Sequence, residues 1–457
     1  MRHVLSPARP GAGRRLRRWA SAWALSSVAL APLSPLRAAL SLPQALQLAE
    51  DRSRQPAAQD AAAASARELA IAAAQRPDPT FKLGLSSLPV SGPDALTLTR
   101  DSFTMLSVGV MQELTRSDKL QARAARSARE ADAALAARAL ALANLRRDTA
   151  MAWLERHFLA RWHDLLVQQR AETALQIDAA EAGYRSGRGP LTEVFAARTA
   201  LAQVDDRLQQ VEPQIGAAII RLARWVGPPA EQALAAPPAL DRLRLATGPR
   251  DSPIDSPVDS PIESLLDSSL ESQLAHHPQI DVLASQLAVA QAEARIATTA
   301  RQADWTLELG YSQRGPAYSN MLSISLSIPL RWDPAQRQDR ELAARLASVE
   351  QWRALAEEAR REHLAQARGW LRQWQGQRKR LAFHDSTLIP LAAERSQAAA
   401  IAYRSGGVGL SVVLEARRLE IEARIDQLRL AMETAGLWAQ LEFLTATDPT
   451  RPLETAP

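Results

Sequence analysis

The chain has 457 residues, and its 55 Lys and Arg against 50 Asp and Glu give a formal net charge of +5. It contains no cysteine, which excludes disulfide bonds, a thiol nucleophile, a thiolate metal site and a lipidated N-terminal cysteine. Hydrophobic residues make up 46 % but aromatic residues only 5 %, a balance typical of long helices and coiled coils rather than of compact enzymes.

Residues 1–38 are expected to be a cleavable signal peptide for export. They carry a basic segment through Arg18, an apolar stretch from Trp19 to about Leu33, and small residues near Ala38. The apolar stretch is too short, and too interrupted by Ser and Pro, for a membrane-spanning helix of roughly 20 residues. The segment holds seven Arg and no Lys, Asp or Glu, so its removal takes the net charge from +5 to −2. The mature chain therefore presents no basic surface that would require nucleic acid as a partner.

Residues 39–243 are predicted to form a first unit of helix, strand, strand, long helix, turn and long helix. A helical segment at 56–75 comes before the strands. Proline is absent from 94–189, and the part from about Lys119 is dense in Ala, Leu, Arg and Glu, which favours a helix. A helix of about 50 residues is about 75 Å long, which suggests a coiled-coil tube or rod. Pro213 predicts a kink in the second long helix.

Residues 244–268 are predicted to be a flexible linker. Asp-Ser-Pro occurs there three times, beginning at Asp251, Asp255 and Asp259, and a proline every four residues prevents a helix. A second unit is predicted at 269–447. Residues 448–457 are then a C-terminal tail.

The second unit repeats the first. Tyr-Arg-Ser-Gly at 184–187 recurs at 403–406, and the regions on either side match in the same order. The matched positions are Phe81–Gly84 with Leu307–Gly310, Val108 and Val110 with Ile324 and Leu326, the helical segments 56–75 and 278–300, Leu191 with Leu410, and Thr192 with Ser411. The segments 335–389 and 391–448 lack proline and predict long helices, with a kink at Pro390.

Four short strands are predicted, because apolar and polar side chains alternate in four places. The apolar members are Phe81, Leu83 and Leu85; Leu106, Val108, Val110 and Leu114; Trp305, Leu307, Leu309 and Tyr311; and Leu322, Ile324, Leu326, Ile328 and Leu330. This alternation fits a membrane β-barrel with lipid outside and water inside, and it equally fits a small sheet on a soluble core. Four strands are too few for a barrel, since about eight is the minimum. Three copies would supply twelve, and their long helices would close into one tube.

The exported chain, the duplicated unit and the two Tyr-Arg-Ser-Gly turns together resemble the TolC family of outer-membrane efflux proteins, over residues 40–447. The resemblance implies a mainly α fold with a small β part. In it, duplicated helix-strand-strand-helix units form a periplasmic α-barrel of coiled-coil helices and a trimeric 12-stranded outer-membrane β-barrel. It also implies a homotrimer surrounded by outer-membrane lipid of a Gram-negative bacterium. Such a trimer acts as the passive exit duct of a tripartite efflux pump.

The most specific part of the resemblance is the pair of helix-turn-helix tips, 184–194 and 403–413. They look like the family's periplasmic tips, which meet the adaptor protein of the pump. The resemblance implies adaptor docking by Tyr184, Arg185, Ser186, Gly187, Leu191 and Thr192, and by Tyr403, Arg404, Ser405, Gly406, Leu410 and Ser411. The two central glycines allow the positive φ at which helices often end, and Thr192 and Ser411 are expected to cap the next helix. A hairpin turn without a docking role is the alternative.

Channels of this family often carry acidic rings where they narrow at the periplasmic end. When the tips are aligned, these acids fall on Glu193 in the first unit and on Glu415 in the second. In a trimer, six carboxylates would lie near the aperture and favour cations. Solvated acids on a helix surface are the alternative interpretation.

A narrower resemblance lies in residues 78–131, on the segments Leu88–Asp94, Leu98–Asp101 and Val108–Leu114. These are similar to the branch that serves heavy-metal pumps of the resistance-nodulation-division (RND) type. That implies an inner-membrane RND pump as partner and export of copper, silver, cobalt, zinc or cadmium ions. A TolC-like duct for drugs or other small molecules is one alternative, and a soluble periplasmic coiled-coil scaffold or adaptor is another.

Motifs for catalysis are lacking. The sequence has no G-x-x-x-x-G-K-[ST] phosphate loop, no G-x-S-x-G elbow and no H-E-x-x-H zinc motif. We therefore expect no enzyme activity, no cofactor and no resident metal. Energy for transport must come from another subunit.

Overall fold

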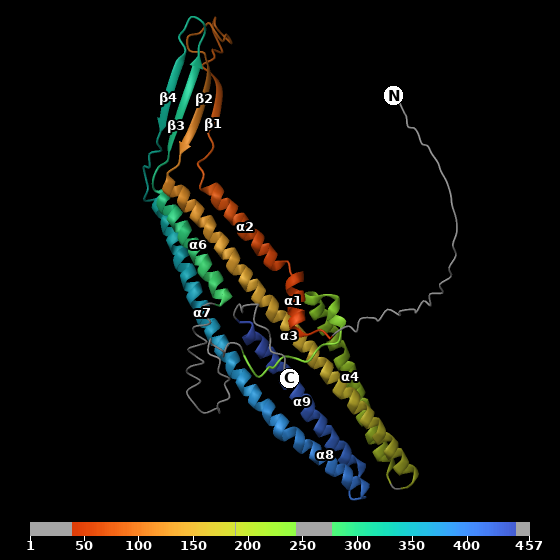
Figure 1. The fold of residues 1–457 in the computed structure, drawn as a ribbon. Coiled ribbons are helices and arrows are strands. Elements are labelled where there is room, and N and C mark those ends of the chain that lie inside the picture. The colour runs from red at the N-terminus through yellow and green to blue at the C-terminus, as the bar shows by residue number, and fades with distance from the viewer. Residues whose placement is uncertain (1–38, 188, 244–276, 445–457) are drawn as a thin grey trace, which may run out of the picture. The chain divides into compact units, whose positions relative to one another are not determined.

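The computed structural model describes residues 39–444 apart from residue 188 and residues 244–276. The predicted signal peptide, linker and C-terminal tail lie outside the described residues. The described part is mainly helical and contains one four-stranded sheet (Figure 1). The expected mainly α fold with a small β part is confirmed.

The helices and strands follow the order predicted for two similar units. The first half contains α1 (Leu42–Arg52), α2 (Gln55–Ala73), β1 (Thr80–Ser86), β2 (Met105–Leu114), α3 (Ser117–Arg185), α4 (Leu191–Val226) and the short 3-10 helix η1 (Pro228–Glu231). The second half contains α6 (Pro278–Ala300), β3 (Trp305–Gln313), β4 (Met321–Ser327), α7 (Gln338–Phe383), the π-helical turn η3 (His384–Leu388), α8 (Ile389–Arg404) and α9 (Leu410–Glu442).

Local sequence explains where several helices begin and how they continue. Ser41 and Gln44 form a capping box at the start of α1, with each side chain bonded to the other residue's backbone N–H. At 69 residues, α3 is roughly 100 Å long. α4 continues through Pro213, so the expected kink does not end the helix. Before Pro390 the chain changes to the π-helical turn η3, because proline cannot donate the α-helical hydrogen bond.

The four strands form one antiparallel sheet in the order β1-β2-β3-β4. Leu83 lies opposite Val108 in the first hairpin, and Leu309 lies opposite Ile324 in the second. These are the positions that the sequence repeat matches, so both hairpins have the same register. Val110 opposite Leu309 joins the two hairpins through β2 and β3.

Apolar clusters hold the helices together at several levels. The largest surrounds Trp153 of α3 and Trp438 of α9, with residues of α1, α4 and α7. The two indole N–H groups are satisfied, because Trp153 donates to Leu40 O at 3.1 Å and Trp438 donates to Arg242 O at 2.8 Å. Figure 1 shows the sheet at one end of the described helices and the turns α3–α4 and α8–α9 at the other.

An ion pair fixes the junction between the sheet and the helices. Lys119 Nζ in the first turn of α3 lies 2.6 Å from Asp304 Oδ2, just before β3, and both side chains are largely buried. The backbone N–H of Arg116 donates to the same carboxylate at 3.2 Å. The start of α3 is thereby tied to the start of β3.

Candidate functional site

The first tip is the turn between α3 and α4. Ser186 N–H donates to Ala182 O at 3.1 Å, and Gly187 N–H donates to Tyr184 O at 2.9 Å. Gly187 has φ +71°, in the left-handed region that glycine adopts at little cost. The expected positive φ is confirmed, and it lets the chain reverse directly after α3.

The second tip, between α8 and α9, is built in the same way. Ser405 N–H donates to Ile401 O at 3.1 Å, and Gly406 N–H donates to Tyr403 O at 3.0 Å. Gly406 has φ +75°. The repeated tetrapeptide thus forms the same turn twice.

The helix caps expected from Thr192 and Ser411 are wrong. α4 begins directly after Pro190 and α9 directly after Gly409, so both hydroxyls lie inside the first helical turn. A side-chain cap comes from the residue before the helix, where proline and glycine have no side-chain acceptor. Neither helix has a cap from its own N-cap residue.

The two tips pack against each other within the chain. Glu193 Oε1 of α4 accepts the backbone N–H of Leu410, the first residue of α9, at 3.0 Å. A Cβ at position 409 would lie 3.0 Å from that oxygen, so Gly409 leaves room for the carboxylate. Beneath this contact one buried cluster joins both tips: Ala180, Val194, Ala197, Leu410 and Val413. No local pattern in the sequence indicates the contact between Glu193 and Leu410.

The residues expected to dock an adaptor differ in exposure. Tyr184 is 49 % exposed and Leu191 is 44 % exposed, but Leu410, the counterpart of Leu191, is only 2 % exposed. Tyr403 is half-buried. The remaining members are exposed: Arg185, Ser186, Gly187, Thr192, Arg404, Ser405, Gly406 and Ser411. Leu410 therefore supports the packing of the tips, while most of the set is accessible.

Both acids expected at a pore entrance have partners in the chain. Glu193 binds Leu410 N–H, as described above. Glu415 forms two hydrogen bonds with Arg418, at 2.7 and 2.9 Å, and these hold the pKa of its carboxyl below the usual range. Arg418 also binds Glu422 at 2.8 Å. Glu415 thus belongs to an ion-pair chain on the surface of α9.

The sheet has one apolar face and one polar face. On the apolar face the register places Phe81, Val110, Leu309 and Ile324 side by side across the four strands, and all are exposed. On the polar face Lys82 Nζ lies 2.6 Å from Glu308 Oε2, and the hydroxyls of Ser107 and Ser312 lie 2.8 Å apart. No described helix packs against either face of the sheet. The apolar face is therefore uncovered in the described part of a single chain.

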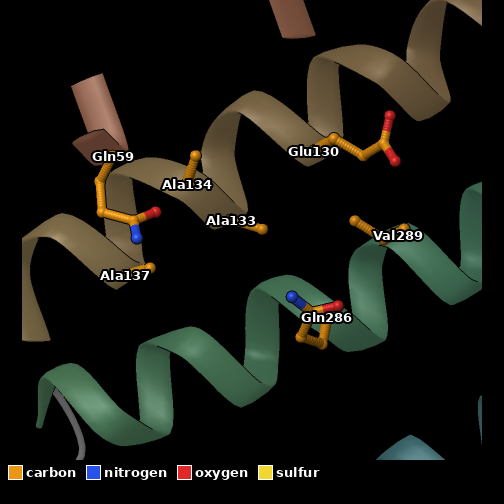
Figure 2. A pocket seen from close by; sticks show the side chains of 7 residues that line it. All are labelled: Gln59, Glu130, Ala133, Ala134, Ala137, Gln286 and Val289. Carbon is orange, nitrogen blue, oxygen red and sulfur yellow. The ribbon is translucent and has the colours of Figure 1, made fainter. Parts of the chain in front are cut away.

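Three further features bear on function. Within the described ranges, no three His, Cys, Asp or Glu side chains are grouped so that they could hold a metal ion. None of the described helices combines the length and the apolar character needed to cross a membrane. A pocket of about 270 Å³ lies between α2, α3 and α6, and Figure 2 shows that alanines and the amides of Gln59 and Gln286 line much of it.

Comparison with known proteins gives matches among solved structures. Neither models of protein families nor curated proteins match the chain. The outer-membrane channel OprN matches with a TM-score of 0.69 and 19 % identity, over 88 % of this chain and 89 % of OprN. The outer membrane protein VceC of Vibrio cholerae matches with a TM-score of 0.68 and 18 % identity, over 88 % of this chain and 95 % of VceC.

CusC, whose structures concern folding and transmembrane channel formation, gives a TM-score of 0.67 at 15 % identity, over 88 % of this chain and 91 % of CusC. This chain has the fold of these outer-membrane channels. At such identities the likeness extends to the fold alone. The resemblance drawn from the sequence to TolC-like channels is confirmed at that level.

Proposed function

We propose that this chain is the exit duct of a tripartite efflux pump of the TolC type, and that three copies assemble in the outer membrane of a Gram-negative bacterium. The observation that carries the proposal is the four-stranded sheet whose apolar face no described helix covers. One apolar and one polar face suit a wall between lipid and water. The channel fold shared with OprN and VceC supports the same conclusion.

Strand number and helix length favour a trimer with a long periplasmic part. One chain has four described strands, and a barrel needs about eight, so three copies would give a barrel of twelve. α3 is roughly 100 Å long, about three times the thickness of a bilayer's hydrocarbon core. Helices of this length would form a tube below the barrel, and transport through it would be passive.

Membrane fractionation tests the duct. The mature chain is expected to fractionate with outer-membrane proteins and to need detergent for extraction. On gels it is expected to migrate as a trimer that dissociates on heating. Native mass spectrometry of the extracted protein gives the copy number. A monomer that is soluble without detergent would contradict the proposal and favour a soluble periplasmic scaffold or adaptor.

The tips are proposed to bind the periplasmic adaptor of the pump. Arg185 and Arg404 are exposed and are the last residues of α3 and α8, directly before the two turns. Both turns lie at the end of the helices away from the sheet (Figure 1). Charge reversal in the double variant Arg185→Glu/Arg404→Glu is expected to reduce adaptor cross-linking and resistance while trimers still form. Arg129→Glu, an exposed change elsewhere on α3, is the matched control. Equal cross-linking in all three proteins would refute the docking role.

Heavy-metal cations are the proposed cargo, with an RND pump in the inner membrane as partner. The support is the sequence resemblance in residues 78–131. A deletion strain is expected to become sensitive to copper, silver, cobalt, zinc or cadmium salts and to recover when the gene is restored. Sensitivity confined to dyes, detergents or antibiotics would instead indicate a duct for drugs or other small molecules.

The acids of the tips are proposed to favour cations at the entrance. Glu193 and Glu415 would give six carboxylates per trimer. Planar-bilayer recordings of Glu193→Gln and Glu415→Gln are expected to show reduced cation selectivity relative to the parent channel. Unchanged selectivity in both variants would assign these acids to tip packing and helix-surface ion pairing only.

A further inference from the structure

A second pocket, of about 210 Å³, lies between α3, α6, α7 and the end of α9. Its volume equals that of about seven water molecules at about 30 Å³ each, and drug-sized ligands need about 300–1,000 Å³. The pocket therefore has room for a small polyatomic ion. Arg147, His277 and His363 line it, and no carboxylate does so in the part of the chain that the structure describes.

His277 has a hydrogen-bond donor to offer to a ligand. Its Nδ1 accepts the backbone N–H of Gln279 at 3.2 Å. Burial, and then the charges of His363 and Arg147, lower the pKa of His277 to about 4, so its ring is neutral at pH 7. A neutral imidazole carries one proton, and because Nδ1 is the acceptor, this proton lies on Nε2. The Nε2–H group is therefore the donor.

This tautomer argues against a metal ion at the two histidines, although their ring centroids lie only 5.0 Å apart. A metal ligand needs a nitrogen lone pair, and His277 has none available: Nδ1 is engaged by Gln279 N–H, and Nε2 holds the proton. Only the imidazole of His363 remains. No third metal-binding side chain joins the pair within the described ranges. The arrangement suits a ligand that accepts hydrogen bonds.

Arg147 gives the pocket a permanent positive charge. Its Nε and Nη2 donate to Asp148 Oδ1 at 2.9 and 2.8 Å, and its Nη1 has no hydrogen-bond partner among the described residues. The charged groups that act on His277 are both positive, namely His363 and Arg147. An oxyanion would relieve this repulsion and would accept charge-assisted hydrogen bonds.

One acceptor in the pocket wall lacks a donor. Oε1 of Gln440, on α9, is buried and has no hydrogen-bond partner in the described part of the chain. A buried polar atom without a partner is costly, so a ligand that carries hydrogen would be favoured. Phosphate at neutral pH keeps at least one P–OH group, whereas sulfate carries no hydrogen. A site built to bond a hydroxyl group discriminates against an analogue that lacks it.

We propose that this pocket binds one inorganic phosphate ion, with Arg147, His277 and His363 as donors and Gln440 as the acceptor of its hydroxyl group. The site lies within a single chain, so the inference does not depend on the proposed duct or on a trimer. Bound phosphate would connect the four helices around the pocket. It should therefore stabilise the folded chain in proportion to its concentration.

Isothermal titration calorimetry of the full chain at pH 7 tests the site, with inorganic phosphate and sulfate as probes at equal ionic strength. Saturable binding of one phosphate per chain is expected, about tenfold tighter than sulfate. Arg147→Gln should weaken phosphate binding at least about tenfold, because a charge-assisted hydrogen bond is lost. Arg129→Gln is the matched control: Arg129 is exposed on the same helix and pairs with Asp132 at 3.1 Å, much as Arg147 pairs with Asp148.

Gln440→Leu tests the acceptor separately. It should abolish the preference for phosphate over sulfate and leave sulfate binding unchanged. If Arg147→Gln does not fold, as judged by helical circular dichroism, this variant decides, and an unchanged preference for phosphate would overturn the proposal.

The remaining outcomes separate the site from the proposed function. No saturable phosphate binding to the folded parent protein, or equal binding in Arg147→Gln and Arg129→Gln, would overturn the site and leave the duct intact. Sulfate that binds the parent as tightly as phosphate would overturn the assignment to phosphate. A chain that binds phosphate but is a monomer soluble without detergent would support the site and refute the duct.

Discussion

Glu193 at the start of α4 binds the first backbone N–H of α9: its Oε1 lies 3.0 Å from Leu410 N, although the two residues are 217 positions apart in the sequence. The preceding residue, Gly409, has no side chain to cap α9. The carboxylate therefore satisfies one of the backbone N–H groups that the first turn of a helix leaves free. Its negative charge also suits the positive end of the helix dipole. One side chain thus couples the tips of the two halves.

Removing this cap is expected to loosen the second tip. Glu193→Ala should cost about 1 kcal/mol, the usual value for a helix cap. The measurement is hydrogen exchange of the amides from 406 to 412, which should accelerate several-fold. Glu193→Gln retains an acceptor oxygen and should have a smaller effect.

Glu415→Ala is the control for this experiment. Its partner Arg418 lies on the same helix, so the change does not touch the contact between the tips. Exchange in residues 406–412 should stay close to that of the parent protein. The same acceleration in both variants would show that loss of negative charge, and not loss of the cap, is responsible.

Truncating the buried leucine of the second tip is expected to destabilise the protein. Leu410 is 2 % exposed and packs in the cluster of both tips, so Leu410→Ala should lower the free energy of unfolding by about 2–5 kcal/mol. Leu175→Ala on α3 is the matched control, because Leu175 is 69 % exposed and its loss should stay within about 0.5 kcal/mol. Denaturant unfolding followed by helical circular dichroism measures both. Equal losses of unfolding free energy in Leu410→Ala and Leu175→Ala would contradict the packing described for Leu410.

Local patterns predicted most of the fold. The strands lie within a few residues of the predicted ranges, because alternation along a strand is a local property. The repeat matched Leu83 with Leu309 in the sequence, and the structure adds that both hairpins pair in the same register. The positive φ of Gly187 and Gly406 followed from their place at helix ends.

The features that the sequence did not predict depend on contacts between residues far apart in the chain or on where a helix begins and ends. The cap of α9 comes from Glu193, and no local spacing indicates a partner 217 residues away. Thr192 was expected to cap α4, but the helix already begins at Leu191. The chain also leaves the α-helical pattern at His384, ahead of the proline that predicted the break.

An added positive charge is expected to be tolerated on the polar face of the sheet and not on the apolar face. Ile324 belongs to the exposed apolar face, and its neighbour Ser325 belongs to the polar face. If lipid covers the apolar face, Ile324→Lys should cost about 2–4 kcal/mol near the bilayer midplane. The expected result is loss of trimer from the outer-membrane fraction for Ile324→Lys and normal amounts for Ser325→Lys. Equal yields would argue against lipid on that face.

His277 at the start of α6 is expected to make the free energy of unfolding depend on pH, and a single substitution can remove this dependence. Its Nδ1 accepts the backbone N–H of Gln279 at 3.2 Å, and its ring stacks on that of His363 with centroids 5.0 Å apart. Burial, and then the charges of His363 and Arg147, lower the pKa of His277 from 6.5 to about 4. The folded protein therefore holds this imidazole neutral at pH values where the unfolded chain has already protonated it.

The sign of the effect follows from proton uptake. Between pH 6.5 and about 4 the unfolded state binds more protons at His277 than the folded state does, so the free energy of unfolding falls as the pH falls. Above pH 6.5 His277 is neutral in both states, and the free energy of unfolding has its full value. Below about pH 4 His277 is protonated in both states, and the loss of unfolding free energy that it causes is complete. His277→Asn keeps an acceptor for Gln279 N–H and removes the titration. Unfolding measured from pH 8 to 4 should therefore show a shallower loss for the variant, and parallel curves for the two proteins would refute this role of His277.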